Sequence, residues 1–435
     1  MFRHALMVAL LVLMPLAAFA ADFTVGDQVV LRPTNPLGVP LHREARSSMF
    51  DRGGDGTRGQ VADTAQDSRW LRIDLQDGRT AWIVSKYLEA ATASPSQPAT
   101  PPDATFANDE GQVFASLQGC EAIVSAGRRM APMSADTLRI GAWNIRWFPD
   151  GDLTPSADSR TDLPWLACVL AWLNVDVLAL QEIRTHRGAE DAWASVTDGV
   201  VGFNGGDWRV DLQECAGENQ QHVGFLWNAA RVSLSNARDR WRMNGAADLG
   251  DSACASNLRP GRSAYVAAIG GGADLHLVSV HLDSGRARRD FDHRQTVFER
   301  FGDMHGALRA ELADDDVVIL GDFNTMGHSE AGGMDSPQEI AAMRAILAQG
   351  TPRFTALPST IPCSEYYQGR CSQLDHIAVS SALINGEAQG AGITVTGYCA
   401  VAGGADLDRD NMPAAYKRLS DHCPLITSIR NQDVD

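Results

Sequence analysis

After residue 20 the sequence has no apolar run of the roughly 18 residues that a membrane-spanning helix needs. It also lacks net positive charge: the formal net charge is -17, so contact with a polyanion would require a local basic patch or bound cations. No cysteines are arranged in paired Cys-x-x-Cys motifs, which argues against a zinc site. Hydrophobic residues make up 44% of the chain and charged residues 21%, which excludes whole-chain disorder.

The first twenty residues have the pattern of a secretory signal. Arg3 precedes an apolar run from Ala5 to Leu16, and Ala18-Phe19-Ala20 is a small-x-small cleavage site. We therefore expect a signal peptide over residues 1–20 and a secreted or periplasmic protein, with an uncleaved N-terminal anchor as the alternative.

The chain has eight cysteines, an even number that in an exported protein predicts disulfides. The favoured pairs are Cys363–Cys371 and Cys215–Cys254, because each flanks one polar or irregular loop. Cys423 is expected to be a buried small hydrophobic residue.

The composition divides the chain into successive segments. Residues 21–89 show short alternating runs, and Asp77-Gly78 between two of them predicts a hairpin, as in a small all-β barrel. This stretch resembles a bacterial Src-homology-3-like domain, which implies docking on a cell-wall or surface ligand. Residues 90–105 are rich in Pro, Ser and Ala and predict a linker. Residues 106–435 form the remaining domain, to which Cys120 is expected to be tied.

Apolar strands and helices alternate from Leu138 onward. Residues 265–269 and 275–280 are predicted strands, and Phe291 to Leu312 carries one apolar stripe that predicts a single long helix. Strands without intervening helices, together with packed helices, indicate an α+β sandwich.

Polar residues come directly before or after the predicted strands, where a side chain is held rigidly yet can face a cleft. These residues are Asn144, Gln181-Glu182, His281, Asp322 with Asn324, Asp375, and Asp421-His422. Carboxylates supply the hard oxygen ligands that Mg²⁺ or Ca²⁺ requires, amides contact a phosphoryl oxygen without adding charge, and histidines exchange protons near neutral pH. The set predicts metal-assisted hydrolysis of a phosphate ester.

Six blocks in order resemble the signature of the endonuclease/exonuclease/phosphatase superfamily, which includes pancreatic-type deoxyribonuclease, abasic-site endonucleases, sphingomyelinases and inositol-phosphate phosphatases. The blocks are Trp143-Asn144, Leu180-Gln181-Glu182, Val280-His281-Leu282, Gly321-Asp322-Phe323-Asn324, Leu374-Asp375-His376-Ile377 and Ser420-Asp421-His422-Cys423-Pro424. The resemblance implies a four-layer α/β/β/α sandwich and a magnesium-dependent phosphoesterase, with Ca²⁺ or Mn²⁺ as alternative metals.

The resemblance also implies a role for each matching residue. Glu182 is the principal metal ligand, and Asp421, Asn144 and Asp322 complete metal binding. His422, oriented by Asp375, activates the attacking water. Asp322 assists the nucleophile or leaving group, His281 stabilises or protonates on the opposite side, and Asn144 and Asn324 position the phosphate.

Two positions depart from the pattern or extend it. Many members place an acidic residue two positions after the first asparagine, whereas Arg146 stands here. Arg146 either holds a phosphate or is a surface or ion-paired arginine. His376 is expected to be a packed strand histidine and not a second base.

The substrate depends on the loops. Arginines after His281 and between residues 238 and 262 either form a basic rim for a polyphosphate or serve solubility among interspersed aspartates. The first hypothesis is an exported endonuclease that cuts DNA or RNA without sequence preference. The alternative is a phospholipid or sugar-phosphate phosphodiesterase of the sphingomyelinase type, for which Trp147-Phe148 is a candidate membrane-contacting tip. A third hypothesis is an idle binding protein. We expect a monomer.

Overall fold

The structure of the chain, a computed structural model, describes residues 28–32, 39–45, 47, 49–53, 57–65, 69–75, 79–90, 109–154, 156, 159–214, 220–245 and 261–434. The chain divides into two units, residues 1–101 and 102–435. The predicted signal peptide, residues 91–105 of the predicted linker and the predicted Cys215–Cys254 pair lie outside the described residues. No helix in the described ranges is both long enough and apolar enough to cross a membrane.

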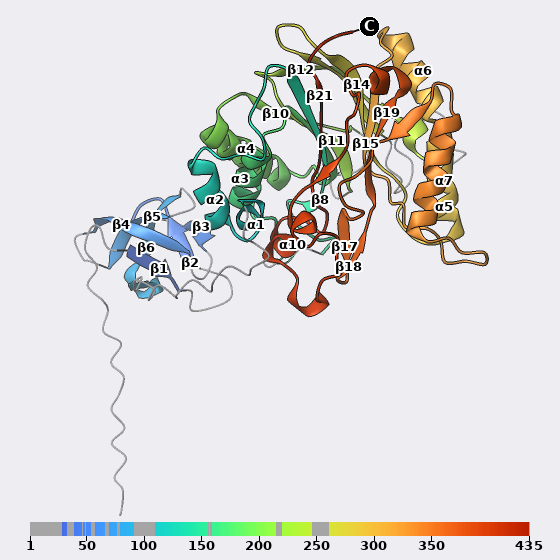
Figure 1. Ribbon diagram of the computed structural model, residues 1–435. Coiled ribbons are helices and arrows are strands. Elements are labelled where there is room, and N and C mark those ends of the chain that lie inside the picture. Colours follow the sequence, from blue (N-terminus) through green and yellow to red (C-terminus); the bar gives the residue numbers. More distant parts are fainter. Residues whose placement is uncertain are drawn as a thin grey trace, which may run out of the picture. The chain divides into compact units, whose positions relative to one another are not determined.

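The described part of the first unit is an antiparallel sheet with the strand order β3-β2-β6-β5-β4-β1-β7 (Figure 1). Its strands are β1 (Gln28–Leu31), β2 (Val39–His42), β3 (Met49–Gly53), β4 (Arg58–Thr64), β5 (Trp70–Leu75), β6 (Thr80–Val84) and β7 (Leu88–Ala90). Alternate residues of β5 are buried, as expected for a sheet with one face on a core. β5 and β6 pair antiparallel around the predicted turn, whose residues 76–78 are outside the described ranges. The arrangement is compatible with a small β domain.

The second unit contains two six-stranded sheets, counted over the described residues. The first has the order β10-β11-β9-β8-β21-β20. Its strands are β8 (Thr137–Phe148), β9 (Val177–Ile183), β10 (Trp208–Leu212), β11 (His222–Asn228), β20 (Thr394–Val395) and β21 (Leu425–Arg430). Next to it lie the helices α1 (Asp109–Val113), α2 (Leu117–Ser125), α3 (Leu163–Leu173) and α4 (Arg187–Asn204). Asp162 begins α3 by accepting a hydrogen bond from the backbone N–H of Trp165, and nearly every residue of this helix is buried.

The second sheet has the order β12-β13-β14-β15-β19-β16. Its strands are β12 (Val232–Arg240), β13 (Gly261–Ala268), β14 (Asp274–His281), β15 (Val317–Asp322), β16 (Phe354–Ala356) and β19 (Asp375–Ser380). The helices on this side are α5 (Arg288–Glu299), α6 (Phe301–Glu311) and α7 (Ser336–Gln349). A hairpin of β17 (Glu365–Tyr367) and β18 (Arg370–Ser372) and the short helices α8 (Ser381–Asn385), α9 (Tyr398–Val401) and α10 (Ala414–Arg418) occupy the connections.

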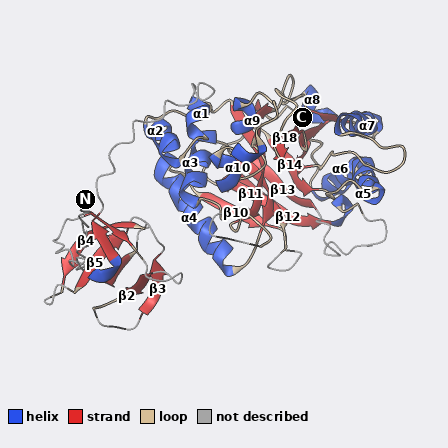
Figure 2. Ribbon diagram, turned by 90° about the horizontal axis from the view of Figure 1, so that it is seen from below, coloured by secondary structure: helices blue, strands red, loops and turns tan. Residues whose placement is uncertain are grey.

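The two sheets pack against each other between the two groups of helices (Figure 2). β14 shows why this arrangement is stable: Leu275 and Leu277 belong to the core shared with the first sheet, whereas Val278 and Val280 pack against α5 and α6. Strands covered on both faces require continuous apolar runs, which is the pattern that the sequence has there. The layers are consistent with the predicted sandwich.

The predicted long helix from Phe291 to Leu312 is wrong in one respect. The chain forms two helices, α5 and α6, which are separated at Arg300. Arg300 has φ -87° and ψ 0°, outside the helical region, and its guanidinium donates to the carbonyl of Asn244 at 2.7 Å. The apolar stripe marked the buried face correctly, but it carried no sign of this tertiary contact.

Three disulfides join described residues. Cys120–Cys168 connects α2 to α3 and confirms that the segment containing Cys120 is tied to the second unit. Cys363–Cys371 closes the β17–β18 hairpin, as predicted. Cys423 is buried, as expected, and forms a disulfide with Cys399 that the sequence did not single out.

Candidate active site

Most of the predicted site residues lie at or next to the ends of strands in the two sheets. Asn144 was expected to follow its strand but lies inside β8, which continues to Phe148, at the point where the pairing of β8 with β9 shifts register. β8 and β9 are parallel, as are β14 and β15, and parallel strands bring their carboxyl ends to the same edge of a sheet. β19 runs antiparallel to β15, so its first residue, Asp375, lies opposite Asp322, while His281 pairs with Asp322 from the other side. Side chains from far-apart parts of the sequence therefore meet at one end of the sandwich.

Asn144 is at the centre of the cluster and is completely buried. Its Nδ2 donates to Glu182 Oε1 at 3.1 Å and to Asp322 Oδ2 at 3.0 Å, while its Oδ1 accepts from the backbone N–H of Arg146. The backbone N–H of Trp147 donates to Glu182 Oε2 at 3.1 Å. Glu182 itself has φ +62°, a left-handed conformation that is uncommon for glutamate and directs its carboxylate away from the regular strand position.

His281 and Asp322 form the second part of the cluster. His281 Nε2 lies 3.3 Å from Asp322 Oδ2 and 3.9 Å from Glu182 Oε1. Asn324 follows with φ +53°; its backbone N–H donates to Asp322 Oδ1 at 2.9 Å, and its side chain donates to the carbonyl of Leu282. Both oxygens of Asp322 are thus held in place.

His422 and Asp375 form the third part. His422 Nδ1 lies 2.8 Å from Asp375 Oδ2, which orients the ring so that Nε2 faces Asp322 Oδ2 at 3.8 Å and Asn144 Nδ2 at 3.5 Å. The side chain of Asp375 is 2% exposed, and Ser364 Oγ donates to its Oδ2 at 2.7 Å. The arrangement resembles a base held in one tautomer by a buried carboxylate.

Two serines that the sequence did not assign to a role support this geometry. Ser364 Oγ accepts from the backbone N–H groups of Leu374 and Asp375, both at 3.0 Å. Ser420 Oγ accepts from the backbone N–H of His422 and donates to the carbonyl of Asn144 at 2.6 Å. A serine carries no distinctive sequence signal for such a role, because its partners come from distant segments.

The electrostatics of the cluster are those of a site built for a cation. Burial and the neighbouring carboxylates of Asp375 and Glu182 raise the pKa of Asp322 to about 7, although His422 opposes the shift. Burial alone would lower the pKa of His422, but Asp375 and Asp322 outweigh it and raise that pKa well above its usual value. Glu182, His281 and Asp322 each offer a ligand atom within 4.8 Å of the others, as do Asp322, Asp375 and His422. The donor set of carboxylates and imidazoles therefore fits a divalent cation.

Glu365 is a neighbour of the site that the sequence analysis missed. It is buried beside the cluster, and its backbone pairs with that of His422. Burial and the carboxylates of Asp421, Asp322 and Asp375 raise the pKa of Glu365 to about 8, against an opposing effect of His422. Glu365 stands in the β17–β18 hairpin, outside the signature blocks, so only the fold could reveal its place beside the site.

The remaining predicted residues lie around this cluster. Asp421 is partly exposed, its carbonyl accepts from the backbone N–H of Tyr366, and it belongs to neither ligand group found among the described residues. His376 is 1% exposed with Nε2 2.9 Å from Thr325 Oγ1, and burial with the charge of Arg344 lowers its pKa to about 3, as suits a packed neutral histidine.

Arg146 matches neither alternative completely. It donates from Nη2 to the carbonyl of Lys417 at 3.2 Å and lies over the ring of Tyr416, 5.7 Å from its centroid. Among the described residues it makes no ion pair, and its Nε is buried without a hydrogen-bond partner. The guanidinium therefore keeps unused donors beside the site.

The predicted basic rim is largely neutralised. Arg294 is fully buried in an ion pair with Glu339, Arg288 pairs with Asp292, and Arg289 pairs with Asp290. Arg240 is held by Glu311 with two bonds of 2.7 Å. Arg259 lies outside the described residues.

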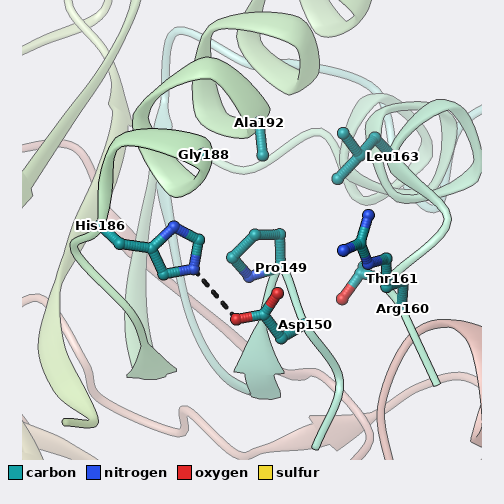
Figure 3. A pocket seen from close by; sticks show the side chains of 8 residues that line it. All are labelled: Pro149, Asp150, Arg160, Thr161, Leu163, His186, Gly188 and Ala192. Carbon is teal, nitrogen blue, oxygen red and sulfur yellow. Dashed lines mark hydrogen bonds and ion pairs between the residues drawn. The ribbon is translucent and has the colours of Figure 1, made fainter. Parts of the chain in front are cut away.

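The Trp147-Phe148 pair is not an exposed tip. Phe148 is fully buried against Trp193, with ring centroids 4.3 Å apart, and Trp147 is half-buried under the guanidinium of Arg184. The next residues lead to a second polar cluster, in which Asp150 Oδ2 accepts from Arg184 Nη1 at 2.8 Å and from His186 Nε2 at 3.0 Å. Figure 3 shows Asp150 and His186 at the wall of a cavity of about 200 Å³.

Comparisons with known proteins identify one family. The sequence pattern of the Endonuclease/Exonuclease/phosphatase family matches residues 141–422. No curated protein matches the chain. Similar solved structures include an endonuclease/exonuclease/phosphatase from Bacteroides vulgatus, at 12% identity over 68% of this chain and 99% of that chain, with a TM-score of 0.47.

Two further solved structures are comparable. TDP2 from D. rerio, complexed with a single-strand DNA product, shares 16% identity over 67% of this chain and 98% of that chain, with a TM-score of 0.42. The human Nocturnin catalytic domain with a bound sulfate anion shares 15% identity over 67% of this chain and 94% of that chain, with a TM-score of 0.40.

Proposed function

Because the chain belongs to the Endonuclease/Exonuclease/phosphatase family, we propose that its second unit hydrolyses a phosphodiester by direct attack of water with the help of a divalent cation. The observation that carries this proposal is the placement of Asn144, which joins the Glu182 and Asp322 carboxylates and lies within 3.5 Å of His422 Nε2. A cation site and a candidate base are therefore adjacent in one buried cluster.

Glu182 and Asp322 are the residues that would hold the cation, with Asp421 and Asn144 as further contributors. Mg²⁺ is the proposed ion, with Ca²⁺ and Mn²⁺ as alternatives, because the set is rich in carboxylate oxygen. When bound, such a cation offsets the carboxylate charge and polarises a phosphoryl oxygen. The pKa of Asp322 is raised mainly by burial and further by the carboxylates of Asp375 and Glu182, and a bound cation would offset both effects.

His422 is the proposed general base. With Nδ1 directed at Asp375, Nε2 is the ring atom that would accept a proton from water, and Ser364 holds Asp375 in place. The charge of Asp322 helps to raise the pKa of His422, so a bound cation that offsets this charge would favour the neutral ring that a base requires. His281, on the other side of Asp322, would stabilise or protonate the departing oxygen. Asn324 and Asn144 would position the phosphate without adding charge.

Nucleic acid is the proposed substrate, and a phospholipid or sugar phosphate is the second candidate. The burial of Phe148 and the half-burial of Trp147 favour the first, because the lipid hypothesis relied on these residues to reach a membrane. The signal-like residues 1–20 and the three disulfides support an exported protein, secreted or periplasmic. The first unit would bind a cell-wall or surface ligand, and a monomer is expected.

Two substitutions test the proposal. Glu182→Gln and His422→Ala should each lower kcat on an oligonucleotide with Mg²⁺ by about 1000-fold, because general-base and metal contributions are typically of this size. Glu190→Gln, an exposed glutamate on α4, is the matched control and should keep wild-type activity. Chelator should abolish turnover and Mg²⁺ should restore it. Wild-type turnover in both site variants, with circular dichroism unchanged, would refute the assignment.

A further inference from the structure

The β17–β18 hairpin has two different faces. Residues opposite each other in an antiparallel pair project to the same side, and the register places Glu365 opposite Ser372 and Tyr367 opposite Arg370. Tyr366, on the other face, is fully buried. Tyr367 is instead 67% exposed, and it is the only aromatic residue among the large exposed hydrophobic residues in the described part of the chain.

The hairpin is held rigidly. The Cys363–Cys371 disulfide closes it, and Tyr366 Oη donates to the carbonyl of Ala405 at 2.6 Å. At the turn, Gly369 has φ +82° and its carbonyl accepts from the backbone N–H of Leu407 at 2.7 Å. A Cβ at Gly369 would come within 2.4 Å of the Leu407 carbonyl, so the turn of the hairpin and the segment around Leu407 are in direct backbone contact. Because the hairpin is already ordered, binding of a ligand that stacks on Tyr367 would cost little conformational entropy of the hairpin.

The outer face of the hairpin forms one wall of a cavity of about 1070 Å³. Arg286, Met326 and the start of α7 also line this cavity. The cavity lies next to the site, because two of its lining residues adjoin the cluster: the backbone of Glu365 pairs with that of His422, and Leu374 directly precedes Asp375. Small-molecule pockets usually measure about 300–1000 Å³, so this space suits a longer ligand that continues beyond the reacting phosphate.

The arginines of this cavity differ from the paired arginines described above. Arg286, Arg370 and Arg409 are exposed and line the cavity, and their side chains make no ion pair or hydrogen bond with any described residue. Two acidic residues line it as well. Asp335 is engaged in capping α7, where it accepts from the backbone N–H of Gln338, and Glu365 is buried on the catalytic side. Three unused guanidinium groups therefore remain for a polyanion.

Resting on the phosphodiesterase function proposed above, we propose that this cavity binds a single-stranded nucleic acid segment next to the scissile phosphate. Tyr367 stacks on an unpaired base, and Arg286, Arg370 and Arg409 contact successive phosphates. Single strands fit best, since the bases of a duplex are already stacked on one another and leave no face for an aromatic side chain. A phospholipid headgroup carries one phosphate and no such ring.

Steady-state kinetics on a single-stranded oligonucleotide, the matching duplex and a p-nitrophenyl phosphodiester test the inference. Tyr367→Ala should raise KM for the single strand about 10-fold, and Tyr367→Phe should restore it, because stacking needs only the ring. Arg286→Ala and Arg370→Ala should each raise that KM about 10-fold and reduce its dependence on salt. In all four variants kcat on the p-nitrophenyl ester should stay at the wild-type value.

Arg353→Ala is the control for arginine removal. Arg353 is exposed and adjoins the strand paired with the far end of β19, five residues or about 17 Å along that strand from Asp375. It should leave every constant unchanged. The inference would be overturned by unchanged KM and salt dependence in the cavity variants. A wild-type protein that prefers the duplex to the single strand would overturn it as well. If the wild-type protein cleaved only the p-nitrophenyl ester, the inference would be overturned but the proposed phosphodiesterase function would stand. If it were inactive on all three substrates, both would be overturned.

Discussion

A buried ion pair joins α5 and α7, the helices that follow β14 and β15 respectively. Arg294 Nε and Nη2 donate to the two oxygens of Glu339 at 2.8 and 2.9 Å, and both side chains are 0% exposed. The remaining donors of Arg294 bond to the carbonyls of Asp283, Gly285 and Gly327, and Glu339 Oε2 accepts from the backbone N–H of Gly327. Asp283 and Gly285 lie in the loop after His281, and Gly327 lies in the loop after Asn324. The ion pair therefore holds both of these loops in place.

Glu339→Gln is therefore expected to be costly. It keeps the size of the side chain but leaves a buried guanidinium without its counter-charge, for which the loss of unfolding free energy is about 3–5 kcal/mol. Urea denaturation followed by tryptophan fluorescence should show a lower midpoint with an unchanged slope. The kcat on any cleaved substrate should also fall, because the His281 and Asn324 loops lose a shared anchor.

The Arg288–Asp292 pair on the same helix is the matched comparison. Both of its side chains are more than half exposed, so Asp292→Asn should change the unfolding free energy by less than about 1 kcal/mol. If Glu339→Gln were no more destabilising than Asp292→Asn, burial would not govern the strength of these pairs and the reasoning would be wrong.

Two further predictions concern the acid range and the backbone of the site. Burial raises the pKa of Asp150, but hydrogen bonds from His186 and Arg184 outweigh this effect, so the pKa is lowered overall. The stabilisation is therefore present above the usual carboxyl pKa and is lost as the pH falls through the lowered pKa. Asp150→Asn should reduce the unfolding free energy at pH 7 and flatten its decline in acid, which urea midpoints at several pH values would measure. Gly321→Ala should lower kcat about 100-fold, because φ is +132° and a Cβ would lie 2.2 Å from the Val280 carbonyl; a crystal structure of the variant with β14 and β15 undisturbed would contradict this.

The sequence by itself determined the strand-end positions of the site residues. Apolar runs such as 275–280 and 317–320 are buried on both faces, and such strands can be recognised from composition alone. A polar residue that comes directly after such a run is then expected at the end of a strand, because it is the next residue in the sequence. This is why Asn144, His281 and Asp322 could be predicted together with the chemistry they share.

Only the tertiary structure decided the contacts between distant segments. Ser364 and Glu365 lie beside Asp375 and His422 because a disulfide-closed hairpin folds against the last strand, and neither residue type signals this in the sequence. The same holds for the arginines. The sequence does not distinguish Arg288 from Arg370, yet Arg288 forms an ion pair with Asp292 whereas Arg370 lines a cavity. Local patterns encode which residues are buried, whereas pairing depends on which surfaces meet in space.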